Sequence, residues 1–182
     1  MTKNRMTDAE LLLLGLVAEM PRHGYELEQA IEERGMREWT QIGFSSIYFV
    51  LGKLEKAGFV SAKQPSGPKS KKTFAITPAG RKVLEEQTLN ALSSVRPTYS
   101  SVLIGMLHWR TVNHGAALES LKAREAAIAM ETKRLERIRF QRQPLPDFVE
   151  ALFDYSAGQL KAEEEWIANT LAYMKTKPTN GD

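Results

Sequence analysis

The chain has 182 residues, of which 42% are hydrophobic and 26% charged, with a formal net charge of +3 and no cysteine. This composition is that of an ordinary folded protein, and it excludes disulfides, thiolate metal sites and cysteine nucleophiles. No apolar run approaches the roughly 20 residues of a membrane span, so we expect a cytoplasmic protein without membrane contact.

Two helices are predicted before residue 35. Thr7 and Glu10 have the spacing of a capping box, and the broadly apolar helix that follows ends before Pro21. A second helix is expected over residues 24–34, with Tyr25 among its inward side chains. Its outward acidic residues are expected to be a solvated face, although such a face also fits a protein partner.

A third helix is predicted over residues 45–57, with Ser45 or Ser46 as its cap and Gly58 at its end. One face repeats apolar residues at helical spacing and is predicted to be buried: Ile47, Val50, Leu51 and Leu54. The other face is hydroxylated, aromatic and basic, which fits insertion into a nucleic-acid groove. The alternative is a second packed face that buries Phe49 beneath another element.

A basic hairpin is predicted after this helix. Residues 59–64 and 73–76 alternate like strands, and a loop rich in proline, glycine and lysine joins them. Between residues 53 and 82 there are eight basic residues and one acidic residue, a local balance of +7. Thr77 and Pro78 then begin a further helix that runs to about Val95.

The order helix, helix, helix, hairpin, helix is typical of a winged helix-turn-helix domain, in which the third helix enters the major groove and the hairpin is the wing. We therefore predict a mainly α fold with a DNA-binding domain at residues 1–95 and a two-stranded wing. Residues 96–182 read as an all-helical dimerisation domain, with helices over residues 99–112, 116–140 and 147–174. Leu121, Ile128 and Leu135 recur every seven residues there, which predicts coiled-coil-like pairing in an antiparallel hairpin.

Three segments resemble the PadR family of bacterial transcriptional regulators: HGYEL at residues 23–27, the pattern of residues 46–58, and residues 77–81 after the wing. Together they cover about the first 85 residues. The C-terminal half looks like the virulence-activator branch of that family in its helical architecture. The resemblance implies a winged-helix dimer that represses or activates promoters, sometimes in response to a small molecule. Phe49 departs from the family, which commonly has proline or a polar residue there.

The leading hypothesis is therefore a transcriptional regulator, most simply a repressor, that binds an inverted-repeat operator in double-stranded DNA as a homodimer. The residues predicted to contact DNA lie on the third helix and in the wing: Ser45, Ser46, Tyr48, Phe49, Lys53, Lys56, Lys69, Lys71 and Lys72. A solvated basic loop is the alternative for the three wing lysines.

A second hypothesis is a small-molecule sensor or protein-interaction module whose winged helix does not bind DNA. Four aromatic residues are candidates for an effector pocket, although core or dimer packing is the commoner role of such residues: Tyr99, Trp109, Phe148 and Tyr155. An enzyme, a cofactor site and a metal site are not predicted. The chain has only three histidines, and it has neither an HExxH motif nor a glycine-rich phosphate loop.

Overall fold

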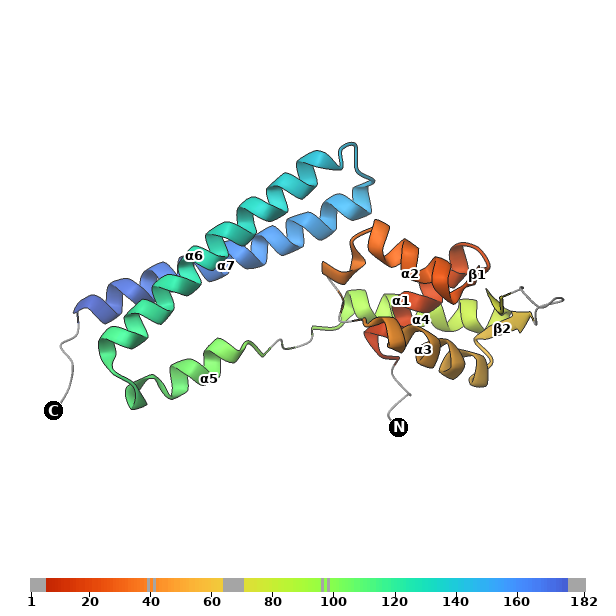
Figure 1. Ribbon diagram of the computed structural model, residues 1–182, viewed down its shortest axis with the longest axis horizontal. Coiled ribbons are helices and arrows are strands. Elements are labelled where there is room, and N and C mark those ends of the chain that lie inside the picture. Colours follow the sequence, from red (N-terminus) through yellow and green to blue (C-terminus); the bar gives the residue numbers. More distant parts are fainter. Residues whose placement is uncertain are drawn as a thin grey trace. The chain divides into compact units, whose positions relative to one another are not determined.

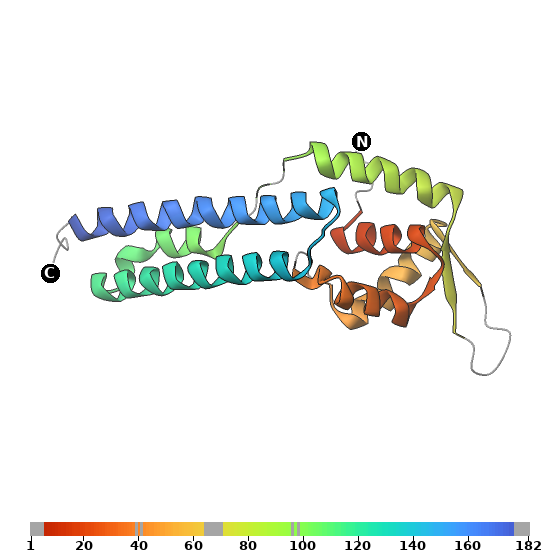
Figure 2. The same cartoon turned by 90° about the horizontal axis from the view of Figure 1, so that it is seen from above.

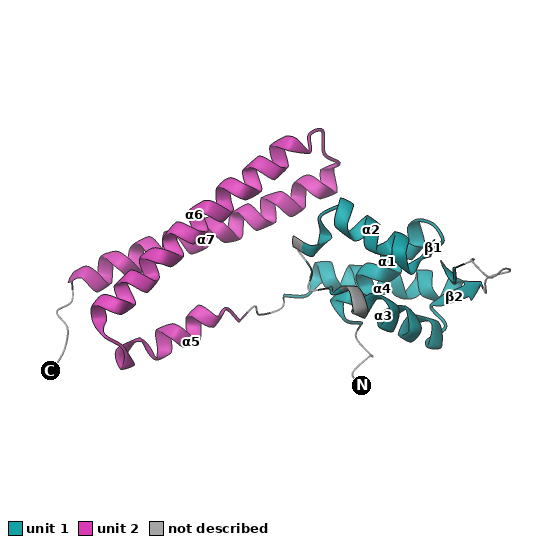
Figure 3. Ribbon diagram, in the orientation of Figure 1, with its two compact units in different colours: residues 1–97 teal, residues 98–182 magenta. Residues whose placement is uncertain are grey.

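The structure of the protein is a computed structural model that describes residues 6–38, 40, 42–63, 71–95, 97 and 99–176. The chain forms two compact units, residues 1–97 and residues 98–182 (Figure 3). The domain boundary expected from the sequence lies two residues before the boundary between these units. No helix within the described ranges is long and apolar enough to cross a membrane.

Unit 1 begins with three helices, α1 (Asp8–Glu19), α2 (Gly24–Glu33) and α3 (Phe44–Lys56), with a short 3-10 helix, η1 (Met36–Glu38), between the last two (Figure 1). The predicted capping box of α1 is confirmed, because the Thr7 hydroxyl accepts a hydrogen bond from the Glu10 amide and Glu10 Oε2 accepts one from the Thr7 amide at 2.7 Å. Gly58 has a φ of 73°, the left-handed conformation predicted for it after α3.

Unit 1 also contains a small antiparallel sheet. Its strands are β1 (Arg22–His23), β2 (Val60–Lys63) and β3 (Thr73–Ile76), in the order β1–β3–β2. The hairpin of β2 and β3 is the predicted wing. The strand β1 was not predicted, because two residues are too few to show an alternating pattern. Helix α4 (Pro78–Ser93) follows, and the Thr77 hydroxyl caps it by accepting the Gly80 amide at 3.0 Å.

The core of unit 1 is a single apolar cluster around α1. Leu13, Leu14 and Val17 of α1 are almost fully buried. They meet the apolar faces of α2 and α3 and the inner side of the sheet, through residues that include Leu27, Ile31, Ile47, Leu51, Leu54, Val60 and Phe74. Burying each such side chain stabilises the unit by roughly 1.5–3 kcal/mol. This core fixes the orientation of α3 and of the wing.

Unit 2 contains α5 (Ser101–Leu107), a 3-10 turn η2 (Trp109–Thr111) and two long helices, α6 (His114–Gln141) and α7 (Asp147–Thr176). The single helix expected over residues 99–112 is divided at His108. The His108 amide lies 3.2 Å from the carbonyl oxygens of both Ile104 and Gly105, a shared bond that tightens the chain into the 3-10 turn.

Helices α6 and α7 lie side by side as an antiparallel hairpin, in agreement with the sequence (Figures 1 and 2). Leu121, Ile128 and Leu135, the predicted seven-residue repeat of α6, are buried. The facing residues of α7 repeat at the same interval: Phe153, Leu160, Ile167 and Met174. Two long seams at this spacing give the knobs-into-holes packing of a coiled coil.

One expectation about α7 was wrong. The apolar spacing of residues 147–174 predicts that Phe148, Leu152 and Tyr155 share one apolar side with Ile167. All three are exposed instead. They follow one another at intervals of four and three residues, so they form a second apolar face on the same helix. The neighbouring Phe153, which the sequence reading overlooked, is the residue in the seam.

Candidate nucleic-acid interface

Helix α3 has one buried face and one exposed face, as its spacing predicts. Ile47, Val50, Leu51 and Leu54 are buried in the core of unit 1. Tyr48, Phe49, Lys53 and Lys56 are exposed on the other side, and Gly52 lies between them. The exposed face is therefore aromatic and basic, and the opposite face of the same helix is packed in the core of unit 1.

The start of α3 differs from the prediction. Its cap is Gly43, which makes no side-chain hydrogen bond to the helix, so the serine cap expected at residues 45 or 46 was wrong. Gly43 still has the extended backbone that an N-cap needs, with a φ of −88° and a ψ of 159°. Ser46 is half-buried near this cap, while the side chain of Ser45 lies outside the described part of the structure.

Gly24 of α2 supports the aromatic ring of Tyr48. A Cβ atom built on Gly24 would lie 2.5 Å from Cε1 of Tyr48, so only glycine leaves room for the ring in this position. The Tyr48 ring therefore rests across the start of α2. This contact gives a physical reason for glycine in the HGYEL segment at residues 23–27.

Lys53 is held by a carboxylate of another helix. Its ammonium nitrogen lies 2.5 Å from Oε1 of Glu10 in α1, and it also lies 5.9 Å from the centre of the Phe49 ring. Burial would raise the pKa of Glu10, but the hydrogen bonds from Lys53 and Thr7 outweigh that effect and hold the pKa below its ordinary value. The charge of Lys53 is thus already balanced within the protein.

The wing lysines differ in their surroundings. Lys72 Nζ lies 2.7 Å from Oε2 of Glu55 on α3 and 5.3 Å from the centre of the Phe74 ring. Lys71 Nζ lies 5.0 Å from the centre of the Tyr25 ring. Lys69 lies outside the described residues. Of the two wing lysines whose positions are described, Lys71 is the more exposed.

Tyr25 was expected to point inward, but half of its side chain is exposed beside Lys71 of the wing. The exposure of Tyr25 could have been predicted from its position in the sequence. Tyr25 precedes the buried Leu27 by two residues, a rotation of about 200° around a helix, so the two side chains leave α2 on opposite sides. Tyr25 is an exposed aromatic residue of this surface that sequence reasoning missed.

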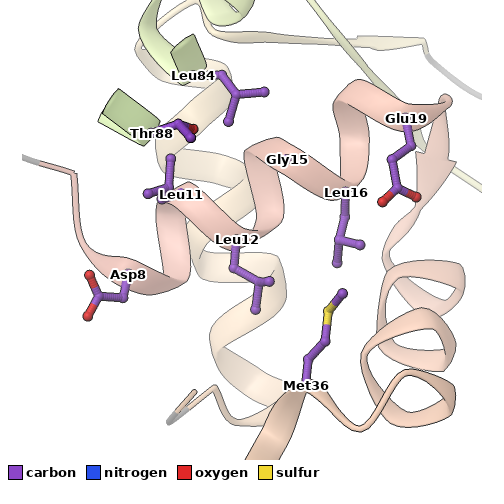
Figure 4. A pocket seen from close by; sticks show the side chains of 9 residues that line it. All are labelled: Asp8, Leu11, Leu12, Gly15, Leu16, Glu19, Met36, Leu84 and Thr88. Carbon is purple, nitrogen blue, oxygen red and sulfur yellow. The ribbon is translucent and has the colours of Figure 1, made fainter. Parts of the chain in front are cut away.

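A shallow apolar pocket of about 480 Å³ lies on unit 1 between α1 and α4 (Figure 4). Leu11, Leu12 and Leu16 line it from α1, and Leu84 lines it from α4. The carboxylates of Asp8 and Glu19 belong to its rim. No candidate residue from the sequence lies here, so this pocket is a surface separate from the face of α3.

The four aromatic candidates for an effector pocket are not brought together. Trp109 lines a pocket of about 350 Å³ formed by α5, η2 and α6, together with residues that include Met106, Val112 and Leu121. Tyr99, Phe148 and Tyr155 are exposed and do not line that pocket. Within the described ranges, no group of three histidine or carboxylate side chains is placed to hold a metal ion.

Unit 1 has three helices followed by a wing of two strands, and the exposed face of its third helix is aromatic and basic. This arrangement defines a winged helix-turn-helix protein. The model of the family described as "Transcriptional regulator PadR-like family" matches residues 13–86. All of the matched residues lie within unit 1.

Solved structures agree with this fold over nearly the whole chain. Bacillus subtilis PadR in complex with operator DNA superposes with a TM-score of 0.72 at 19% identity, covering 91% of this chain and 98% of that one. The same protein in complex with p-coumaric acid gives 0.68 at 17% identity, covering 94% and 99%. A PadR-like regulator from Bacillus cereus gives 0.65 at 20% identity, covering 94% and 100%.

A relative in sequence is an uncharacterized 37.1 kDa protein in transposon TN4556 of Streptomyces fradiae. It is 37% identical over 84 residues, which cover 46% of this chain and 23% of that protein. The chain thus matches about a quarter of the length of this relative. The solved structures support the fold of both units, while the sequence match is confined to less than half of the chain.

Proposed function

We propose that this chain is a cytoplasmic transcriptional regulator that binds an inverted-repeat operator as a homodimer and acts as a repressor. The observation that carries the proposal is the exposed face of α3, where Tyr48, Phe49 and Lys56 stand out from a well-packed helix. In this assignment unit 1 binds DNA, unit 2 joins the two protomers, and neither unit has a catalytic role.

The chemistry of the face supports duplex DNA as the partner. Ammonium groups neutralise phosphates, and aromatic rings contact sugars and the apolar parts of base edges. Lys71 in the wing and Lys56 on α3 are exposed for phosphate contacts. A relative with this fold, Bacillus subtilis PadR, has been crystallised with its operator, which favours the same kind of partner here.

The homodimer is supported by apolar surface on unit 2. The exposed apolar residues of this unit lie mainly on α5 and around the α6–α7 turn: Leu103, Ile104, Leu107, Phe140, Phe148, Leu152 and Tyr155. Apolar side chains gathered on a helical unit mark a surface that a partner covers. A second copy related by a twofold axis is the simplest partner, and it also provides two α3 helices for two half-sites.

Selection of duplexes from a random pool by the purified full chain tests this proposal. We expect an inverted repeat whose half-sites lie roughly 34 Å apart, one turn of the double helix. Analytical ultracentrifugation of the selected complex should give two chains per duplex. Enrichment of no sequence, or of a single asymmetric half-site bound by one chain, would contradict the proposal.

The sign of regulation is tested by transcription in vitro from a promoter that overlaps the selected site. A repressor lowers the amount of transcript as protein is added, because the bound dimer occludes the polymerase. A promoter with a scrambled site is the control and should be unaffected. A rise in transcript from the intact site would make the protein an activator instead.

A second candidate function is response to a small molecule. The pocket beside Trp109 is apolar and large enough for a small aromatic compound, and a relative of the same fold has been crystallised with p-coumaric acid. Titration with p-coumaric acid should then quench tryptophan fluorescence saturably, and Trp109→Phe should remove the response while Trp166→Phe keeps it. Saturable quenching by a protein that selects no DNA would favour a sensor without DNA binding.

A further inference from the structure

Among the aromatic side chains of α2 and α3 whose exposure is described, Phe49 is the most exposed. The ring is 69% exposed in the middle of the outer face of α3, whereas Tyr48 and Tyr25 are about half exposed. The core of unit 1 is complete without this ring. The ring adds nothing to the core, so its exposed apolar area is available to a partner.

The Phe49 ring also contacts a lysine side chain of the same helix. Lys53, one turn further along α3, has its ammonium group 5.9 Å from the centre of the Phe49 ring. That ammonium group is fixed by Oε1 of Glu10, while Oε2 of the same carboxylate accepts the Thr7 amide. Glu10 is only 9% exposed and lies in α1, the central helix of the core. A chain of contacts therefore runs from the core to the exposed ring.

Space is kept open next to the ring. A Cβ atom on Gly52 would meet nothing within 4 Å, so no neighbour within unit 1 requires glycine at this position. A helix-interior glycine costs about 1 kcal/mol relative to alanine, and that cost brings no gain in internal packing here. The missing side chain lets a flat partner approach α3 closely beside Phe49.

We propose that Phe49 is a specificity-determining residue that reads a thymine methyl group in the major groove, and that Glu10 and Lys53 position its ring. Thymine carries the one apolar group on the base edges of the major groove, and a neutral aromatic ring has no hydrogen bond to offer the other edges. This inference rests on the proposed function. It assigns Lys53 to positioning the ring, and leaves phosphate contacts to Lys56 and the wing.

Replacement of thymine by deoxyuridine provides the test, because it removes only the methyl group. The probe is the duplex recovered by random-pool selection, and each thymine of the half-site is replaced in turn, symmetrically in both half-sites. At one position in the half-site, loss of the methyl group should weaken binding by the full-length protein about fourfold per half-site, or about fifteenfold for the dimer.

Phe49→Ala should bind the thymine and deoxyuridine duplexes with nearly equal affinity. Glu10→Gln tests the positioning role, because glutamine retains the capping box but removes the carboxylate charge that fixes Lys53. This variant should bind DNA with a smaller preference for thymine. Lys56→Ala is the matched control from the same face. It should weaken binding to both duplexes equally and leave the preference unchanged.

The outcomes separate this inference from the proposed function. Specific binding of an inverted repeat in which no deoxyuridine replacement changes the affinity would overturn the thymine contact and leave the regulator intact. The same conclusion follows if Phe49→Ala keeps the full preference for thymine. An unchanged preference in Glu10→Gln would remove the positioning role. Failure of the protein to select any DNA would overturn the proposed function and this inference together.

Discussion

Lys72 Nζ in the wing lies 2.7 Å from Glu55 Oε2 in α3, so an ion pair joins the wing to the helix that we assign to the major groove. Glu55 is the single acidic residue among residues 53–82. Its carboxylate is directed to the wing, away from the exposed aromatic face. The pair therefore balances this negative charge and links the wing to α3.

This pairing distinguishes two neighbouring lysines. Lys71→Ala should reduce the dependence of log K on log salt by about 0.9 per protomer on duplex DNA, the change expected for one lost phosphate contact. Lys72→Ala should change that slope less, because its charge is balanced by Glu55. Filter binding or fluorescence anisotropy at several salt concentrations measures both slopes. Equal changes in the two variants would show that Lys72 leaves Glu55 in the complex.

Two glycines should respond differently to alanine. A Cβ atom on Gly80 would lie 2.0 Å from the carbonyl oxygen of Phe59, so backbone must move, and Gly80→Ala should destabilise unit 1 by about 3 kcal/mol. A Cβ atom on Gly24 would displace the outer part of the Tyr48 ring, which can turn toward solvent. Gly24→Ala should thus cost under about 1 kcal/mol while weakening DNA binding.

Urea denaturation and DNA titration of the two glycine variants make this comparison. Tyr48→Phe is a suitable control, because it keeps the ring and its contact with Gly24. A Gly24→Ala protein with full DNA affinity would mean that the position of the Tyr48 ring is irrelevant to binding.

Unit 1 should lose stability in acid through two carboxylates of α1. The hydrogen bond from Arg34 holds the pKa of Glu19 below its ordinary value, and the pKa of Glu10 is lowered as well. A lowered pKa stabilises the fold above the unfolded value of about 4.5, and this stabilisation is lost as the pH falls through the folded-state values.

Urea denaturation at pH values from 7 down to 3 measures this effect. Glu19→Gln should flatten the loss of stability below pH 4.5, and at neutral pH it should cost less than about 1 kcal/mol because the pair with Arg34 is largely exposed. Glu86→Gln, a change at an exposed acidic residue of α4, is the control. A steeper loss of stability in Glu19→Gln than in the unchanged protein would contradict the assignment.

Unit 2 offers a matched pair of substitutions for the dimer. Leu107 is exposed on α5, so Leu107→Asp should leave the free energy of unfolding of the protomer within about 0.5 kcal/mol and raise the fraction of monomer. Ile128 is buried in the seam of α6 and α7, so Ile128→Ala should cost about 2–5 kcal/mol of protomer stability. Sedimentation velocity and thermal denaturation distinguish the two effects. An unchanged fraction of dimer in Leu107→Asp would show that α5 is not part of the dimer interface.

Local chemistry made much of the fold predictable from the sequence. Thr7 with Glu10, Thr77 with Pro78 and the positive φ at Gly58 each act over a few residues, and the helices they bound lie where they were expected. The repeat of Leu121, Ile128 and Leu135 also identified the seam of the helical hairpin, because a regular spacing implies a continuous buried face.

The remaining features depend on contacts between distant parts of the chain. Lys53 and Glu10 are 43 positions apart, and no spacing rule joins them, so the sequence presented Lys53 as a simple basic residue of the outer face. The strand β1 exists because β3 passes beside residues 22 and 23. The two apolar faces of α7 could not be told apart from the sequence, because apolar residues on two sides of a long helix do not recur at a single helical spacing.

The three-stranded sheet also has a mechanical consequence. Strand β3 is hydrogen-bonded to β2 on one side and to β1 on the other, and β1 continues directly into α2 at Gly24, beneath the Tyr48 ring. If the wing shifts when it binds a phosphate backbone, we expect the shift to reach the Tyr48 ring through the sheet and Gly24. In the proposed complex with DNA, we therefore expect the wing's contact with the backbone and the base contacts of α3 to depend on each other.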